Sequence, residues 1–250
     1  MSLNGIPVQN LPFLYDNNLL DSYISTTSLG LSGGQCRDDT NTVDMILNNA
    51  LTISGSSVGV NGLDTGTLAN TTWYYMFLIS DPVTANPTAA LLSASRTAPL
   101  LPFGYSAKRY IGSWLTDGSA HFIKMIKYGN SGYRRCWWDV APNVLSAGVA
   151  SSFTTLSLIA GVPPTLQTLV TFNASVTPTA AGNSASLRPT GSTSGGRYAT
   201  ISGSVAAVIQ VSQIICPCLL ATVSSVLVPA VDYLVVGSLG LSVAAFDDYV

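Results

Sequence analysis

Residues 205–231 read VAAVIQVSQIICPCLLATVSSVLVPAV, and no residue from Ala199 to Val231 is charged. A stretch this long and this apolar has the length of a membrane-spanning helix. Polar residues and two prolines interrupt it, however, and residues 209–212 alternate apolar and polar side chains with the period of a β-strand. We therefore expect two or three consecutive strands here and no membrane insertion.

Composition favours strands throughout the chain. Glutamate is absent, all 12 acidic residues are aspartates, and lysine occurs only at Lys108, Lys124 and Lys127. Glutamate and lysine normally form the solvated faces of helices. In their place stand Ser, Thr, Asn, Gly and β-branched residues, which are typical of strands and tight turns. The sequence thus predicts an all-β fold with helix confined to a turn or two.

About eleven short runs have the pattern of strands, and Gly, Asn, Asp or Pro residues separate most of them. These runs are residues 51–60, 72–79, 90–95, 108–115, 121–128, 133–139, 153–159, 166–172, 198–212, 219–228 and 233–236. Strands at this spacing predict a β-sandwich or a jelly-roll-like domain. Residues 180–196, rich in Gly, Ser, Thr and Asn, are expected to form a long loop between strands.

Residues 1–25 lack a clear period and predict an extended N-terminal arm. Its apolar cluster, formed by Leu11, Phe13, Leu14 and Tyr15 with a proline, is flanked by Asn and Asp. The cluster is too short to form a core and too apolar to remain in water, so we expect it to pack on another subunit. Residues 26–250 are expected to form one β-sandwich domain, with a subdivision near 140–150 left open.

The chain is poor in charge, with 9% charged residues and a formal net charge of -2. Such a surface stays soluble alone with difficulty, which predicts burial against copies of the chain in a trimer or closed ring. Six of the ten basic residues lie between Lys108 and Arg135. They are too dispersed to predict nucleic-acid binding. Because no basic segment followed by an apolar stretch begins the chain, we expect no signal peptide and synthesis in a cytosol.

Arg134, Arg135, Trp137 and Trp138 place guanidinium groups beside large aromatic rings, a combination enriched in binding hot spots. Strand alternation sends the two tryptophans to opposite faces, so at most one of them must enter the core. These four residues are candidates for an interface or a glycan-stacking site. Simple packing within the sheet is the alternative interpretation.

Catalytic interpretations find little support in the sequence. Asp64-Thr65-Gly66 has the composition of an aspartic-protease motif, but no second copy supplies the paired carboxylate. A β-turn explains the tripeptide better. The single histidine, His121, is expected in a strand, and the absence of glutamate removes the usual glycosidase acid. We expect no enzymatic activity and no cofactor.

Asp38, Asp39 and Asp44 are concentrated near Arg37, and a hard cation could use their oxygens. The spacing is not that of an EF-hand, so turn hydrogen bonds and an ion pair to Arg37 are the favoured interpretation, and no metal site is expected. The four cysteines show no zinc spacing, and Cys216 and Cys218 stand too close together for a normal disulfide. We expect buried free thiols, with a pairing of Cys36 and Cys136 left open.

A series of short motifs occurs in a fixed order between residues 28 and 130. The motifs are Gly34-Gln35-Cys36-Arg37-Asp38 with Asn41 and Asp44, Asn61-Gly62-Leu63-Asp64-Thr65-Gly66, Trp73-Tyr74-Tyr75, Leu91-Leu92-Ser93-Ala94-Ser95, Pro99-Leu100-Leu101-Pro102-Phe103-Gly104-Tyr105 and Arg109-Tyr110-Ile111-Gly112. This series resembles a β-rich domain recurrent in virion proteins of tailed bacteriophages, often in tail-fibre or appendage proteins. The resemblance implies a virion location after assembly in the host cytoplasm, oligomerisation, and no catalytic residues.

Three classes of function follow from these expectations. The first is a bacteriophage virion structural protein, either tail- or appendage-associated or a capsid decoration subunit. The second is a receptor- or glycan-binding module on the same particle. The third, an aspartic protease or glycan depolymerase, is disfavoured by the missing glutamate, the missing second Asp-Thr-Gly and the single histidine.

Overall fold

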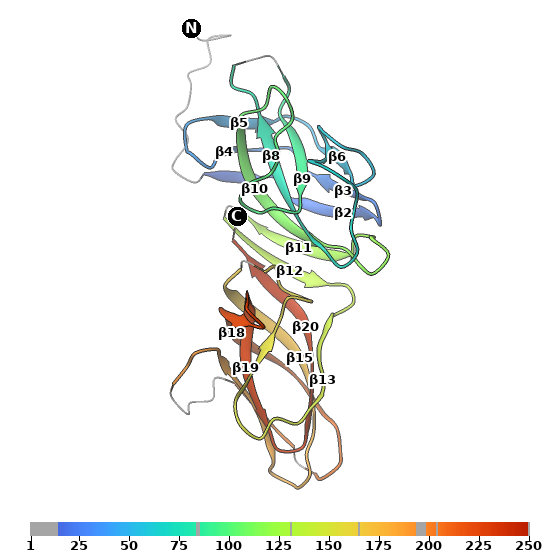
Figure 1. The fold of residues 1–250 in the computed structure, drawn as a ribbon, viewed down its shortest axis with the longest axis vertical. Coiled ribbons are helices and arrows are strands. Elements are labelled where there is room, and N and C mark those ends of the chain that lie inside the picture. Colours follow the sequence, from blue (N-terminus) through green and yellow to red (C-terminus); the bar gives the residue numbers. More distant parts are fainter. Residues whose placement is uncertain are drawn as a thin grey trace. The chain divides into compact units, whose positions relative to one another are not determined.

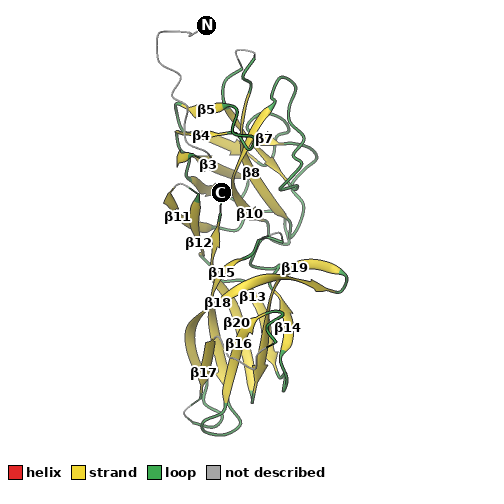
Figure 2. Ribbon diagram, turned by 90° about the vertical axis from the view of Figure 1, so that its left-hand side faces the viewer, coloured by secondary structure: helices red, strands yellow, loops and turns green. Residues whose placement is uncertain are grey.

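The computed structural model describes residues 15–83, 86–130, 132–164, 166–193, 199–203 and 205–249. These residues form strands joined by turns, and no helix occurs among them (Figures 1 and 2). The all-β, sandwich-like fold class predicted from the sequence is therefore confirmed.

The chain divides into two compact units. Unit 1 contains the described residues up to Ile123, then Lys127–Arg134 and Tyr249, and unit 2 contains Lys124–Ile126 and Arg135–Asp248. The division thus falls between residues 123 and 135. The prediction of one domain with a subdivision near 140–150 placed the change too late in the chain.

Unit 1 is built from short antiparallel strands, with one parallel pair. Its strands are β1 (Asp16–Asn18), β2 (Asp21–Ser25), β3 (Ser28–Leu31), β4 (Gly34–Arg37), β5 (Asp44–Leu47), β6 (Leu51–Ser54), β7 (Gly62–Leu63), β8 (Trp73–Ser80), β9 (Ala89–Ser93) and β10 (Ala107–Leu115). They form sheets in the orders β1-β4-β5, β2-β3-β6 and β10-β8-β9-β7, and only β7 and β9 run parallel. The strands β11 (Met125–Asn130) and β12 (Tyr133–Trp138) each contain residues of both units.

Strand β8 is the centre of the unit 1 core. All eight of its residues are buried, and it lies between β10 and β9. Its sequence, WYYMFLIS, is the continuous apolar run expected of a strand covered on both faces. Strand β10 pairs with β8 along its whole length, with a register shift between Tyr110 and Gly112.

The predicted arm extends too far into the chain, because strands β1 and β2 lie within residues 1–25. Leu19 is fully buried, and the Tyr15 carbonyl accepts a hydrogen bond of 3.0 Å from the Arg37 backbone N–H. The Tyr15 hydroxyl also accepts a hydrogen bond of 2.9 Å from the Gln35 amide. Residues 15–25 therefore belong to unit 1, and the other cluster residues, Leu11, Phe13 and Leu14, lie outside the described residues.

Unit 2 contains the longest strands of the described chain. Its strands after β12 are β13 (Asn143–Gly148), β14 (Thr154–Ser157), β15 (Thr168–Thr177), β16 (Ser184–Pro189), β17 (Ala199–Ser202), β18 (Gln210–Val223), β19 (Val226–Val235) and β20 (Ser238–Asp248). Their order is β12-β20-β15-β18-β19-β16-β17, with β13 beside β20 and β14 beside β19. Strand β18 pairs with β15 over Gln210–Cys218 and then with β19 over Leu219–Val223. One strand thus changes neighbours halfway along its length.

The uncharged stretch of residues 205–231 forms consecutive strands, β18 and β19, as predicted. Among the described residues, no helix has both the length and the apolar character needed to cross a membrane. Three details were wrong. Residues 198–212 are not one strand, because they contain β17 and the start of β18. Residues 219–228 are a hairpin that turns at Ser224 and Ser225, with φ values of 50° and 68°. Residues 180–196 are not one long loop, because they contain β16.

Candidate functional site

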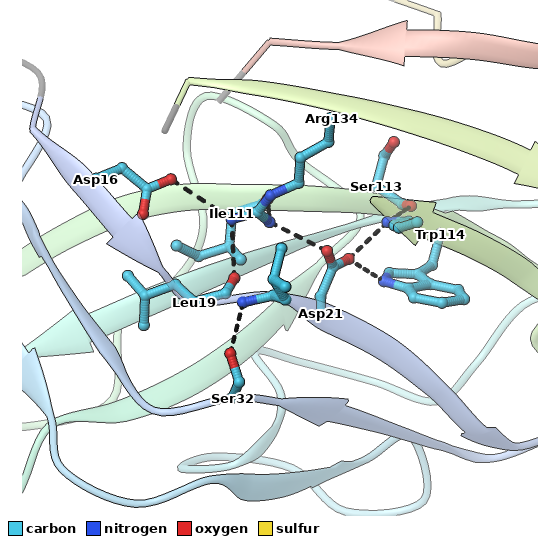
Figure 3. A network of polar contacts seen from close by, with 10 residues as sticks. Asp16, Leu19, Asp21, Ser32, Ile111, Ser113, Trp114 and Arg134 are labelled. Carbon is cyan, nitrogen blue, oxygen red and sulfur yellow. Dashed lines mark hydrogen bonds and ion pairs between the residues drawn. The ribbon is translucent and has the colours of Figure 1, made fainter. Parts of the chain in front are cut away.

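Arg134, predicted as an interface residue, is instead the centre of a buried charge cluster in unit 1 (Figure 3). Its side chain is 2% exposed. One guanidinium nitrogen donates to Asp21 Oδ1 at 3.1 Å and to the Ile111 carbonyl, and the other donates to the Leu19 carbonyl at 2.8 Å and to Asp16 Oδ2 at 3.5 Å. Because these contacts engage both terminal nitrogens inside the unit, the interface prediction for Arg134 is wrong.

Asp21 of β2 accepts hydrogen bonds from three side chains of the cluster. Besides Arg134, its carboxylate accepts hydrogen bonds from the Lys127 ammonium at 2.5 Å and from the Trp114 indole N–H at 2.6 Å. Lys127 also donates to the Ser113 carbonyl at 2.7 Å and lies 4.1 Å from the centre of the Trp114 ring. The cluster therefore joins β2, β10, β11 and β12 by charge-assisted hydrogen bonds.

The two carboxylates of the cluster have opposite pKa shifts. Burial by itself raises the pKa of Asp21, but the charges of Lys127 and Arg134, with the hydrogen bonds from Lys127 and Trp114, outweigh it and hold the pKa below 3.8. For Asp16, burial dominates and raises the pKa above 3.8, although Arg134 and Arg109 oppose it. Two carboxylates shifted in opposite directions can form an acid/base pair in an active site. Here both side chains are at most 1% exposed, so a substrate has no access to them.

The close packing of Gly112 against this cluster gives a testable prediction. A Cβ atom at Gly112 would lie 2.6 Å from Asp21 Oδ2 and 3.1 Å from Asp21 Cγ. Because three donors hold that carboxylate, it cannot move aside without breaking hydrogen bonds. We expect Gly112→Ala to lower the free energy of unfolding in urea by about 1–3 kcal/mol. The matched control is Gly118→Ala, whose added Cβ meets nothing within 4 Å; equal losses for the two variants would contradict this account.

Arg135 and the two tryptophans follow the alternation expected of β12. Trp138 is 6% exposed, donates its indole N–H to the Gly161 carbonyl at 3.1 Å and packs against Phe246. Trp137 is half-buried, with the Arg135 guanidinium 5.6 Å from its ring centre. Arg135 itself forms an ion pair of 2.7 Å with Asp247. The interface prediction for Trp138 is therefore wrong, because its ring lies in the core, and Trp137 is the one of the two that keeps a partly accessible ring.

The acidic cluster near Arg37 forms a turn, as the favoured interpretation predicted. Asp38 Oδ1 accepts hydrogen bonds of 2.7 Å from the backbone N–H groups of Thr42 and Val43. Although burial opposes it, hydrogen bonding with Thr40, Val43 and Thr42 lowers the pKa of Asp38. Arg37 pairs with Asp44 at 3.2 Å, and Lys108 pairs with Asp39. In the described parts of the chain, no three His, Cys or Asp residues are grouped as a metal site would require.

The remaining catalytic candidates also lie in turns. Asp64 accepts a hydrogen bond of 3.1 Å from the Leu100 backbone N–H, and Gly66 has a φ of 71°. The prediction that His121 lies in a strand is wrong. Its backbone N–H donates to Asp117 Oδ1 at 3.0 Å, in the turn before β11, and its side chain is half-exposed.

All four cysteines are buried free thiols, as expected, and Cys36 and Cys136 form no disulfide. Burial raises the pKa of Cys36, Cys216 and Cys218 to about 12. Since the thiolate is the reactive form, these thiols stay unreactive until the pH approaches that value. We expect a thiol reagent at about pH 8 to label essentially none of them in the native protein and all four after denaturation. Rapid labelling of the folded protein would contradict this burial.

Three open grooves on the two units contain no charged residue. Their volumes are about 480 to 590 Å³. The groove in unit 1 beside β1 and β4 is lined largely by amides, namely Asn17, Asn18, Gln35, Asn48 and Asn49. Without a titratable side chain these grooves offer no acid, base or nucleophilic carboxylate. They can bind a neutral, hydroxyl-rich ligand or a protein surface.

The surface that the sequence analysis missed is the hairpin Leu219–Val228 of unit 2, called the β18–β19 hairpin below. Leu219 is 38% exposed, and Val226 and Leu227 are each 56% exposed. Figure 2 shows this hairpin projecting beyond the strands to which it is joined. The sequence feature that indicates this surface is the absence of charged residues on both sides of Ser224 and Ser225, which leaves the two strands of the hairpin without a polar face.

No family model, curated protein or solved structure matches the chain in the comparisons with known proteins.

Proposed function

We propose that this chain is a structural subunit of a bacteriophage particle, tail- or appendage-associated, that assembles with copies of itself. The observation that carries the proposal is the exposed, uncharged β18–β19 hairpin on a chain with 9% charged residues. The ordered motifs between residues 28 and 130, which resemble a domain of tailed-phage virion proteins, support the same class. A capsid decoration subunit is the alternative position within the particle.

The physical reason is the cost of leaving the hairpin in water. Burying an apolar side chain of the size of Val or Leu contributes about 1.5–3 kcal/mol. Val226 and Leu227 keep more than half of their surface exposed, beside the partly exposed Leu219. A subunit of a particle recovers this free energy when a neighbour covers the hairpin, whereas an isolated protein remains prone to nonspecific association.

The proposal is tested on particles released by cells that carry the gene. Particles are purified on a density gradient, washed in high salt and probed with an antibody against the recombinant chain. The chain should co-sediment with the particles in an amount comparable to that of known coat or tail proteins. A chain found only in the soluble fraction of the cells would contradict the proposal.

A second candidate function, glycan binding on the particle, is favoured by the amide-lined groove of unit 1. Asparagine and glutamine side chains both donate and accept hydrogen bonds, as sugar hydroxyls require. We expect Asn48→Ala with Asn49→Ala to remove binding to host-surface glycans, measured by titration calorimetry, if this groove is the site. If this variant still binds the glycans, the binding site lies outside the amide-lined groove, and the half-buried Trp137 is the next residue to change.

A further inference from the structure

The β18–β19 hairpin is a two-stranded ribbon to whose edges no other strand of the described residues pairs, although Val228 at its base is buried. Beyond Cys218, strand β18 pairs only with β19, because its pairing with β15 ends there. Strand β19 gains its next neighbours from residue 229 onward, where the Pro229 carbonyl accepts a hydrogen bond from Leu158 and β14 begins to pair. Among the described strands, both outer edges of the hairpin therefore expose unpaired backbone groups.

Neither face of the ribbon is polar. Cross-strand partners share a face, so Leu219, Ala221, Val223, Val226 and Val228 lie on one face, and Leu220, Thr222, Leu227 and Pro229 lie on the other. An antiparallel strand with one solvated face normally alternates apolar and polar residues. Apolar side chains on both faces are instead typical of strands that are covered on both sides. An isolated two-stranded ribbon is also marginally stable at best.

The edge of Leu219–Val223 is not protected against pairing. Proteins usually block an exposed edge with a charge, a proline or a bulge. The sequence of this edge is LLATV, which contains no charge and no proline, and its register to β19 is continuous. An edge strand of this kind is a template for an added strand.

We propose that this edge pairs antiparallel with the same edge of a second copy of the chain, so that two hairpins form one four-stranded sheet across a two-fold axis. An antiparallel pair related by a two-fold axis gives both strands the same donors and acceptors, so one edge complements itself. No charge between Ala199 and Val231 repels the second copy, and none selects a partner of opposite charge. The contact rests on the proposed function and deepens it, and it requires an even number of copies in place of the expected trimer.

The first test is the mass of the intact chain in solution, measured by light scattering at micromolar concentration. The wild type should contain an even number of chains. Thr222→Lys with Leu227→Lys places two positive charges on one face of each hairpin, and the charges at position 222 of the two copies lie on neighbouring strands. The dissociation constant should therefore rise by about a hundredfold or more. Both positions are exposed, so the variant should keep the circular dichroism of the wild type.

The matched control is Val211→Lys with Ile215→Lys, which adds the same two charges to apolar residues of β18 outside the hairpin that are 74% and 49% exposed. It should leave the mass unchanged. A wild type that is monomeric or contains an odd number of chains would overturn the contact, and so would equal behaviour of control and hairpin variants. A monomer that binds phosphatidylcholine vesicles through the hairpin would show a lipid surface as the occupant instead.

A crosslinking test locates the contact directly. Thr222→Cys introduces an exposed thiol, and the native thiols are buried and do not compete. A short bis-maleimide should join two copies of Thr222→Cys, whereas Val211→Cys should remain uncrosslinked. Absence of crosslinked pairs in Thr222→Cys would reject hairpin pairing. Even-numbered assembly of a chain that is absent from particles would keep the contact and reject the virion role. A wild-type chain that is monomeric in solution but present in particles would keep the virion role and reject the contact.

Discussion

Asp21→Asn is expected to lower the free energy of unfolding by about 3–5 kcal/mol, because it leaves buried cations without their counter-charge. The substitution keeps the size of the side chain, so the loss reports on charge and not on packing. Lys127 and Arg134 are 1% and 2% exposed, and after the change only Arg134 keeps a carboxylate partner, Asp16 at 3.5 Å. Urea denaturation followed by tryptophan fluorescence measures the loss, since Trp114 contacts Asp21 directly.

The control for this prediction is an exposed ion pair. Asp139 lies 3.3 Å from Lys124, and both side chains are about half exposed. Exposed pairs contribute little, so Asp139→Asn should cost less than about 1 kcal/mol. A loss in Asp21→Asn no larger than the loss in Asp139→Asn would show that the buried cluster does not stabilise unit 1.

The pH dependence separates the two buried carboxylates. The pKa of Asp21 is depressed by folding, so its contribution to stability is fully present above the unfolded value of 3.8 and is lost as the pH falls further. The pKa of Asp16 is raised, so above that pKa the ionised Asp16 carboxylate lowers the free energy of unfolding. This destabilisation disappears when the Asp16 carboxyl is protonated at lower pH. Asp16→Asn should therefore cost less than Asp21→Asn at neutral pH. The difference in free energy of unfolding between Asp16→Asn and Asp21→Asn should become smaller below pH 3.8.

Deletion of residues 2–20 is expected to destabilise unit 1 by more than the loss of Leu19 alone, which is about 2–5 kcal/mol for a fully buried leucine. The deletion also removes β1, whose residues pair with Gly34–Cys36 of β4, and the Leu19 carbonyl that accepts from Arg134. The loss should appear as a lower melting temperature in calorimetry. This reverses the result expected if residues 1–25 formed a detached arm.

Deletion of residues 2–14 is the comparison, because it removes no described residue. It should change the melting temperature far less than the longer deletion. If both deletions gave the same melting temperature, β1 and Leu19 would contribute nothing to unit 1, and the arm would extend to residue 20 after all.

The sequence predicted those elements whose own residues determine them. Strand β8 was placed within one residue because a continuous apolar run has few alternatives to a buried strand. Strand β16, with the sequence SASLRP, was missed because its small polar residues resemble a loop. It becomes a strand through its pairing with β17 and β19, which lie farther along the chain.

The buried cluster could not be read from the sequence for a similar reason. Arg134 and Arg135 are neighbours of identical type, and alternation alone does not say which of them faces inward. The choice depends on Asp16 and Asp21, which precede Arg134 by more than 100 residues and were assigned to an arm. The sequence feature that could have indicated a buried charge cluster was the pair of aspartates, Asp16 and Asp21, in a segment without a clear strand pattern.

A cryo-EM map of the particles released by cells that carry this gene tests the central claim most directly. The account predicts ordered copies of this β-rich chain in the particle, with the β18–β19 hairpin covered by the same hairpin of a neighbouring copy. A map in which all the density is explained by other proteins would contradict the assignment as a virion structural subunit.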